Sequence, residues 1–213
     1  MLYTTFDNNS INNQLDLKKS GADLMAPLEQ IALQGEHAGA IIHSIKNLMR
    51  EGNLYPEETD VNELIKETLS ILNYEVLDTQ LKITLNLMDD LPHIMTNKTQ
   101  IMQVISNLSR NSIEALHNAS EINPELRIET SVSEGHIHVH VRDNGPGIPY
   151  ELKSKILNTY FTTKLGGTGL GLGICRTLIE EHCGKLIVQE HEEQGAWFMF
   201  TLPIKRSNQN IHA

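Results

Sequence analysis

Three blocks of sequence, each rich in glycine or asparagine, follow one another in the second half of the chain. Residues 103–115 carry two asparagines four positions apart, residues 143–148 read Asp-Asn-Gly-Pro-Gly-Ile, and residues 166–173 form a glycine-rich run. Glycine permits a positive φ, and the N–H groups at a helix start can cradle phosphates. Any one block could arise by chance, whereas the ordered set predicts a pocket for ATP.

Composition and charge limit the classes of protein to which the chain can belong. Its 213 residues leave room for one sizeable domain plus an appendage. A formal net charge of -10 disfavours nucleic-acid binding as the main role. No apolar run reaches the roughly 20 residues that span a bilayer, and the first residues lack the pattern of a signal peptide. Cys175 and Cys183 are too far apart on one predicted helix for a disulfide, so we expect a cytoplasmic protein.

The first quarter of the chain contains one clear helical pattern. From Ile31 to Met49 apolar residues recur at heptad spacing, which predicts a helix of about 20 residues with one long apolar seam. Such a seam requires partner helices, either from the same chain or from a second subunit. Gly52 and Pro56 mark its end.

The remaining patterns predict an α+β fold. Asp60 is the expected N-cap of a second helix, at 61–72, and Glu63 is placed to complete a capping box. Because strands and helices do not alternate strictly, we expect helices on one face of a mixed sheet. Helices are predicted at 61–72, 99–118, 150–158 and 169–182, and strands at 81–87, 128–132, 137–141, 186–188 and 197–202.

The asparagine block offers ligands for a hard cation. Asn107 and Asn111 are four residues apart on a predicted helix, so their side chains face the same way. An amide oxygen suits Mg²⁺, which takes the rest of its ligands from water and triphosphate oxygens. Arg110 lies next to this face and could reach a phosphate. The alternative interpretation is that these asparagines are simply solvated on an amphipathic helix.

The second block places a carboxylate at the end of an alternating strand. Asp143 precedes a turn in which Gly145 and Gly147 allow a flat ring to approach the backbone. A carboxylate fixed there can accept a hydrogen bond from the exocyclic amine of adenine, which guanine lacks. Asp-Asn-Gly is also a common turn signal, although Pro146 and the second glycine argue against a simple hairpin.

The third block differs from the two commonest glycine-rich phosphate loops. It lacks the Gly-Lys-Ser/Thr that ends a Walker A loop, and the residues before it give weak support for the strand that a dinucleotide fingerprint needs. Its backbone N–H groups can still bind phosphates at the start of the following helix. Lys164 could lie over the phosphates or be a solvated loop lysine.

In this order the three blocks resemble the N, G1 and G2 boxes of sensor histidine kinases, members of the ATPase superfamily that includes gyrase B, Hsp90 and MutL. Residues 160–164 look like the family's F box, and 195–203 look like its final strand. Only three residues separate Thr163 from Gly167, which resembles the short ATP lid of nitrogen-regulator-type kinases. The resemblance covers roughly residues 60–204.

The resemblance implies a Bergerat-type α/β sandwich that binds ATP and Mg²⁺. It places Asn111 on the metal, Asp143 on adenine, and Gly169 and Gly171 in the lid hinge, with Asn111 and Arg110 as catalytic residues. We expect a partial dimerisation region at 1–52, the catalytic domain at 53–206 and a tail at 207–213. The residues expected to bind Mg²⁺-ATP are Asn107, Asn111, Asp143, Gly145, Gly147, Ile148, Lys164, Gly167, Thr168, Gly169, Leu170 and Gly171.

The upstream helix also resembles the family. Residues 34–42 look like the second helix of the dimerisation hairpin, which implies a homodimer through residues 22–51. The phosphoacceptor histidine of the first hairpin helix is not found. His43 has an asparagine four residues on, but Ser44 replaces the acidic residue of the motif. If Leu2 is aligned just after that motif, the chain begins downstream of the acceptor and should not phosphorylate itself.

The sequence therefore predicts the cytoplasmic catalytic core of a two-component sensor histidine kinase. It would transfer the γ-phosphoryl of ATP to a histidine, in trans or in a longer protein, for relay to a response-regulator receiver domain. The alternatives are an anti-sigma-type serine kinase of the same fold, and a non-catalytic ATP-binding scaffold that docks a regulator.

Two further sets of residues are assigned structural roles. His136, His138 and His140 alternate with apolar residues, which predicts the solvent side of a half-buried strand; the alternative is a metal site. The methionines expected to fill the core are Met49, Met88, Met95, Met102 and Met199.

Overall fold

The computed structural model describes residues 55–73, 81–119, 123–163, 168–189 and 194–204. Residues 49–162 and 169–213 group into one compact unit, and residues 1–48 with 163–168 into another. The description that follows concerns the first of these units. The predicted helix from Ile31 to Met49, His43 and the proposed dimer segment 22–51 lie outside the described residues, as do Lys164 and Gly167.

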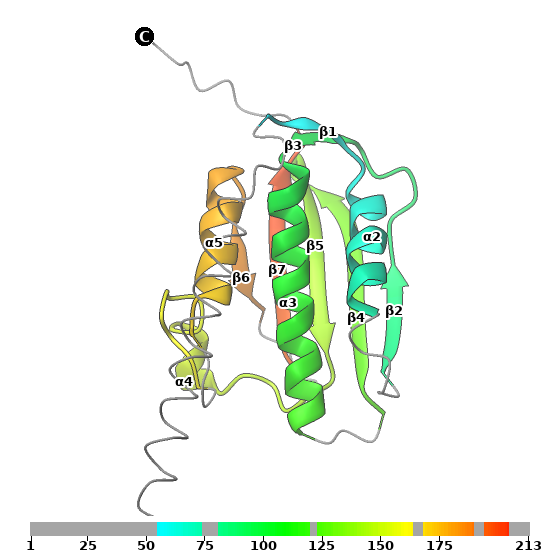
Figure 1. Cartoon of the computed structure of the whole chain (residues 1–213). Helices are drawn as coiled ribbons and strands as arrows, with labels where there is room; N and C mark the ends of the chain where they lie inside the picture. The colour runs from blue at the N-terminus through cyan, green and yellow to red at the C-terminus, as the bar shows by residue number, and fades with distance from the viewer. Residues whose placement is uncertain (1–54, 74–80, 120–122, 164–167, 190–193, 205–213) are drawn as a thin grey trace, which may run out of the picture. The chain divides into compact units, whose positions relative to one another are not determined.

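Three helices lie on one face of a five-stranded sheet (Figure 1). The sheet has the order β2-β4-β5-β7-β6, in which only the pair β2–β4 is parallel. This mixed sheet under a helical layer confirms the predicted α+β sandwich. Its strands are β2 (Lys82–Asn86), β4 (Glu125–Ser133), β5 (His136–Asp143), β6 (Leu186–Val188) and β7 (Trp197–Pro203), and the helices are α2 (Val61–Asn73), α3 (Lys98–Asn118) and α5 (Gly171–Glu181).

Strand β5 shows why one face of the sheet packs against the core and the other faces solvent. Ile137, Val139 and Val141 are fully buried, whereas the residues between them are half-buried. Their register continues the buried row onto both neighbours, since Val141 pairs with Ile128 of β4 and with Phe198 of β7. The alternation therefore places the three histidines on the face away from the helices, as the sequence predicts.

Helix α3 is held at its start by polar contacts. The Asn97 side chain is the N-cap and accepts a hydrogen bond from the backbone N–H of Gln100. The backbone N–H of Asn97 in turn donates to Nε2 of His182, while Nδ1 of His182 lies 2.7 Å from the Leu178 carbonyl oxygen. A carbonyl can only accept, so Nδ1 donates its proton to Leu178 and Nε2 accepts from Asn97. This buried imidazole joins the end of α5 to the start of α3.

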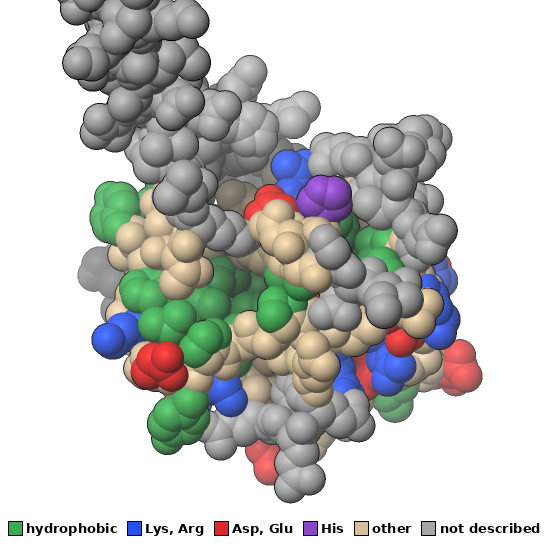
Figure 2. Space-filling model, turned by 90° about the horizontal axis from the view of Figure 1, so that it is seen from below, with side chains coloured by type: hydrophobic (Ala, Val, Ile, Leu, Met, Phe, Trp, Pro, Cys, Tyr) green, Lys and Arg blue, Asp and Glu red, His purple; other side chains and the backbone are tan. Residues whose placement is uncertain are grey.

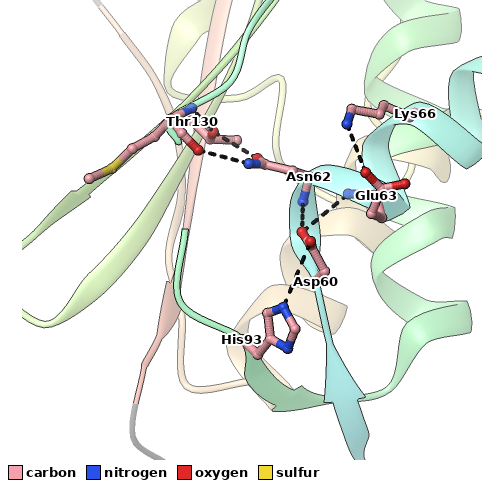
Figure 3. Close-up of polar contacts among 7 residues, drawn as sticks. Asp60, Asn62, Glu63, Lys66, His93 and Thr130 are labelled. Atoms are coloured by element: carbon pink, nitrogen blue, oxygen red, sulfur yellow. Dashed lines mark hydrogen bonds and ion pairs between the residues drawn. The ribbon is translucent and has the colours of Figure 1, made fainter. Parts of the chain in front are cut away.

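The start of α2 is capped by the residue that the sequence predicts. Oδ1 of Asp60 accepts hydrogen bonds from the backbone N–H groups of Asn62 at 2.8 Å and Glu63 at 3.2 Å (Figure 3). The Glu63 carboxylate does not complete the expected capping box, because it pairs with Lys66 at 2.7 Å. The cap thus depends on Asp60 alone among these side chains.

A closed set of three hydrogen bonds ties the capped end of α2 to the sheet. Asn62 donates from Nδ2 to the Met88 carbonyl, and its Oδ1 accepts from the Thr130 hydroxyl (Figure 3). That hydroxyl accepts in turn from the Met88 N–H. Each polar atom of the set has a partner, which lets the nearly buried Thr130 sit in β4 without an unsatisfied hydroxyl.

The structure departs from the sequence predictions in three further places. A two-stranded sheet of β1 (Glu57–Thr59) and β3 (Ile94–Thr96) was not predicted, because each strand has only three residues. The helix expected at 150–158 is the short α4 (Tyr150–Lys153), followed by turns. Met88 and Met95 do not fill the core, since their exposed fractions are 42% and 52%.

The cap of α2 generates the first prediction. Replacing Asp60 with alanine leaves two N–H groups of the first turn without their acceptor, so the free energy of unfolding should fall by about 1 kcal/mol. Asp60→Asn should retain most of the stability, because asparagine caps equally well. Urea denaturation of both variants measures this. Lys66→Ala is the control, since it removes only an exposed ion pair. An equal loss in that control would contradict the assignment.

Candidate nucleotide-binding site

Asp143 ends β5 inside the protein, with 2% of its surface exposed. Its Oδ1 accepts two hydrogen bonds, each at 3.0 Å, from the backbone N–H groups of Gly145 and Ala196. Its Oδ2 is buried and has no hydrogen-bond partner among the described residues. A buried carboxylate oxygen without a donor is unfavourable, so the geometry suits a ligand that brings an N–H group to Oδ2.

The loop after Asp143 is tied to the strands on both sides of β5. The N–H of Asp143 donates to the Ala196 carbonyl at the entrance to β7. The Asn144 side chain accepts from the Glu125 N–H and donates to the Asn123 carbonyl, both at 2.8 Å. The carboxylate therefore has a fixed direction before any ligand arrives.

Glycine is required where this loop meets the turn before β7. Gly147 has a φ of +79°, and a Cβ there would lie 2.9 Å from the Gly195 carbonyl oxygen. Gly195 has a φ of +117°, and a Cβ there would overlap the Asp143 carbonyl oxygen. The two turns interlock, so a side chain at either position would separate them. Gly145 keeps an ordinary φ, and its neighbours are Asp143 Oδ1 and the Leu116 side chain.

Helix α3 supplies the three predicted polar side chains. Asn107 and Asn111 are half-buried, one turn apart, and Arg110 is exposed. Burial raises the pKa of the Cys175 thiol to about 12, and a hydrogen bond from the Asn107 side chain lowers it by a smaller amount. Asn107 thus reaches toward α5. Asn111 lies one turn nearer to Leu116, the residue that packs beside Gly145.

The glycine-rich block leads into α5 through a tight backbone contact. The Tyr160 N–H donates to the Gly169 carbonyl at 2.8 Å, and Gly169 has a φ of +64°. A Cβ on Gly169 would meet the Tyr160 backbone, so only glycine fits there. Tyr160 itself has a φ of +68°, which is strained for a bulky residue. Gly171 opens α5, and no atom of the described residues lies within 4 Å of a Cβ placed on it; Leu170 precedes it without a side-chain cap.

Apolar side chains gather at the end of the molecule where β5 and α3 finish. Ile148, Ile156 and Leu172 are partly buried there against the core. Figure 2 looks onto this end and shows hydrophobic side chains in the middle of the face. A cavity of about 190 Å³ lies beside the loop, lined by residues such as Gly147, Ile148 and Ala196. It is smaller than a typical ligand pocket, and neither Asn111 nor Asp143 lines it.

Comparisons with known proteins agree with this geometry. Residues 96–206 match the family described as histidine kinase-, DNA gyrase B-, and HSP90-like ATPases. The sensor protein TdiS of Thauera aromatica is 34% identical over 198 residues, covering 90% of this chain and 35% of TdiS. The sensor protein FixL of Bradyrhizobium diazoefficiens is 33% identical, covering 85% of this chain and 36% of FixL. The chain thus spans about a third of the length of these relatives.

Solved structures lead to the same family. The catalytic domain of histidine kinase ThkA, in a nucleotide-free form, has a TM-score of 0.63 and 34% identity, covering 71% of this chain and 97% of that one. The complex of ThkA with the response regulator TrrA has a TM-score of 0.64 and 26% identity, covering 94% and 53%. The chain belongs to the histidine kinase-like ATPases, which confirms the resemblance to sensor histidine kinases.

The structure adds residues that the sequence analysis did not assign to the site. Ala196 holds Asp143 through its N–H, and Gly195 allows the close approach of the two turns. The sequence places both residues only in the closing strand at 195–203, because a backbone N–H donor cannot be recognised from residue type. Within the described residues, no helix has the length and apolarity that crossing a bilayer requires.

Burial of Cys175 generates the second prediction. A maleimide should label Cys183 in the native protein within minutes and leave Cys175 unlabelled, since Cys183 is exposed and the Cys175 thiol has a pKa of about 12. Denaturant should release both thiols, and mass spectrometry counts the labels. Cys183→Ser is the matched control and should take no label when folded. Native labelling of Cys175 at the rate of Cys183 would contradict the packing of α5 on α3.

Proposed function

We propose that this chain is the ATP-binding catalytic core of a two-component sensor histidine kinase. It binds Mg²⁺-ATP at the end of the sheet where Asp143 lies and transfers the γ-phosphoryl to a histidine. The phosphoryl then passes to an aspartate on a response-regulator receiver domain. The observation that carries the proposal is the buried Oδ2 of Asp143, which has no partner in the part of the chain that the structure describes.

The carboxylate of Asp143 selects adenine. Its Oδ1 is already occupied by two backbone donors, so only Oδ2 remains for a ligand. A carboxylate is acceptor-only, and the adenine exocyclic amine is a donor. Guanine presents a carbonyl oxygen at that position, which would face Oδ2 with no proton between them. The site therefore favours ATP over GTP.

The phosphates and the cation would lie toward α3 and the start of α5. Asn111 would hold Mg²⁺ through its amide oxygen, while Asn107, which contacts Cys175, would line the pocket from one turn away. Arg110 would neutralise phosphate charge. The backbone N–H groups of Gly169, Leu170 and Gly171 would cradle the phosphates at the α5 N-terminus. Phosphoryl transfer needs mainly this positioning and charge neutralisation; bound Mg²⁺ supplies part of the latter.

The relatives support the partner and the setting. TdiS and FixL are named sensor proteins, and ThkA is seen in complex with a response regulator. By analogy we assign a receiver domain as the partner of this chain and the cytoplasm as its location. Residues 22–51 are proposed as a homodimer interface. We propose that a histidine supplied in trans or in a longer protein accepts the phosphoryl group.

Nucleotide binding to an Asp143 variant tests the pocket. In Asp143→Asn the amide NH₂ must face either the ligand amine or the Gly145 and Ala196 N–H groups, so one donor always opposes another. Binding of a fluorescent ATP analogue in the presence of Mg²⁺ should weaken at least about tenfold. Asp89→Asn, an exposed carboxylate, is the control and should bind like the unmodified chain. Unchanged affinity in Asp143→Asn, or binding of GTP as tightly as ATP, would refute the assignment.

Transfer to a supplied acceptor tests the enzyme. The chain is incubated with γ-labelled ATP, Mg²⁺ and a separate helical domain that carries an acceptor histidine. We expect acid-labile, base-stable label on that domain, because a phosphoramidate hydrolyses in acid. Asn111→Ala should abolish the label while binding of adenosine is retained.

Two other outcomes separate the alternatives. Acid-stable label would indicate a serine kinase of the same fold. Tight ATP binding without transfer would indicate a scaffold that docks a regulator.

A further inference from the structure

A cluster of rings occupies the outer face of the sheet, behind the candidate site. Trp197 Nε1 donates a hydrogen bond to His140 Nδ1 at 3.0 Å, and the two ring centroids are 5.6 Å apart. His138 stacks beside His140 with a centroid distance of 6.4 Å. The Arg142 guanidinium carbon lies 5.3 Å from the centroid of the Trp197 ring. None of these four side chains has a role in the proposed nucleotide pocket.

The chemistry of the two partners fixes the protonation state of His140. An indole N–H can only donate, so Nδ1 of His140 must carry a lone pair and the ring proton resides on Nε2. An imidazolium carries N–H on both nitrogens and cannot accept. The bond between Trp197 and His140 therefore exists only while His140 is neutral.

The surroundings of His140 favour that neutral form. Burial lowers the pKa of His140, Glu129 opposite it on β4 raises the pKa, and His138 lowers it. On β7 the residue paired with His140 is the uncharged Met199. Two positions along the same face of the sheet lie the guanidinium groups of Arg142 on β5 and of its partner Arg127 on β4. Because the pKa is lowered in the folded state, the bond is complete near neutrality and is lost as the pH falls through that lowered value.

The ring cluster is directly connected to Asp143. Ala196, the residue before Trp197, donates its N–H to Asp143 Oδ1 and accepts the Asp143 N–H at its carbonyl. Arg142, the residue before Asp143, is the register partner of Trp197. A shift of Trp197 thus moves the strand entrance that aims the Asp143 carboxylate.

We propose that His140 and Trp197 form a proton-sensitive latch behind the nucleotide site. Neutral His140 holds Trp197 and keeps the Ala196 N–H on Asp143, whereas protonated His140 releases Trp197 and weakens adenine-nucleotide binding. The second half of this statement rests on the proposed ATP pocket. The first half concerns only the two rings and can be measured without nucleotide.

Intrinsic fluorescence tests the latch, because Trp197 is the single tryptophan of the chain. Its emission should change in one step as the pH falls from about 7.5 to about 5, with a midpoint below the usual histidine value of about 6.5. His140→Asn places an amide oxygen near the position of Nδ1 and cannot titrate, so its emission should stay constant over that range. His138→Asn is the matched control and should keep the step. Persistence of the step in His140→Asn, or its absence in the unmodified chain, would overturn the latch.

Nucleotide affinity then tests the coupling. Between pH 7.5 and pH 5.5 the dissociation constant of an ATP analogue should rise for both proteins. The factor of increase should be about five times larger for the unmodified chain than for His140→Asn, which corresponds to the loss of about one hydrogen bond. The variant retains every other pH-dependent contribution, including protonation of the nucleotide itself, and so corrects for them. Circular dichroism at both pH values confirms that each protein remains folded.

Failures of the two proposals are distinguishable. An equal pH dependence in both proteins would overturn the coupling even though nucleotide binds. No binding at either pH would refute the ATP pocket and with it the coupling, while the fluorescence titration would still decide the latch.

Discussion

The structure depends on the double attachment of Asp143 to the entrance of β7. Its backbone N–H reaches the Ala196 carbonyl, and its carboxylate receives the Ala196 N–H. A carboxylate that is almost fully buried needs these charge-assisted hydrogen bonds, which are stronger than neutral ones. They leave the buried Oδ2 without a donor among the described residues, and Gly147 and Gly195 let the two turns approach closely enough to form them. The contact between Asp143 and Ala196 thus both joins β5 to β7 and positions the carboxylate of the candidate site.

Helices and strands with a clear periodicity of apolar residues could be predicted from the sequence, whereas elements that exist only through tertiary contacts could not. The alternation in β5 and the helical pattern of α3 each span enough residues for the buried face to be visible. Strands β1 and β3 have three residues each and exist because they pair with one another. The short α4 was overestimated, since an apolar pattern at 150–158 does not reveal that turns follow Lys153.

The candidate site divides in a similar way. Asp143, Gly147 and Gly169 could be named from the sequence, because a carboxylate at a strand end and glycines at positive φ are properties of residue type. The part played by Ala196 could not, because it acts through a backbone N–H that every residue except proline possesses. The contact of Asn107 with Cys175 was also missed. It depends on how α5 lies against α3, and spacing along one helix does not encode that.

The pleat of β5 explains how one strand can serve both faces of the sheet. Successive side chains point to opposite sides, so Val141 and Asp143 face the helices while His140 and Arg142 face away. The register with β7 repeats this division, with Phe198 in the core and Trp197 outside. A shift of one residue would exchange the faces and expose the carboxylate. The buried side chains of β5 and β7 therefore fix the direction of the Asp143 carboxylate. The same register fixes the pairing of His140 with Trp197, and so connects the outer face of the sheet to the site.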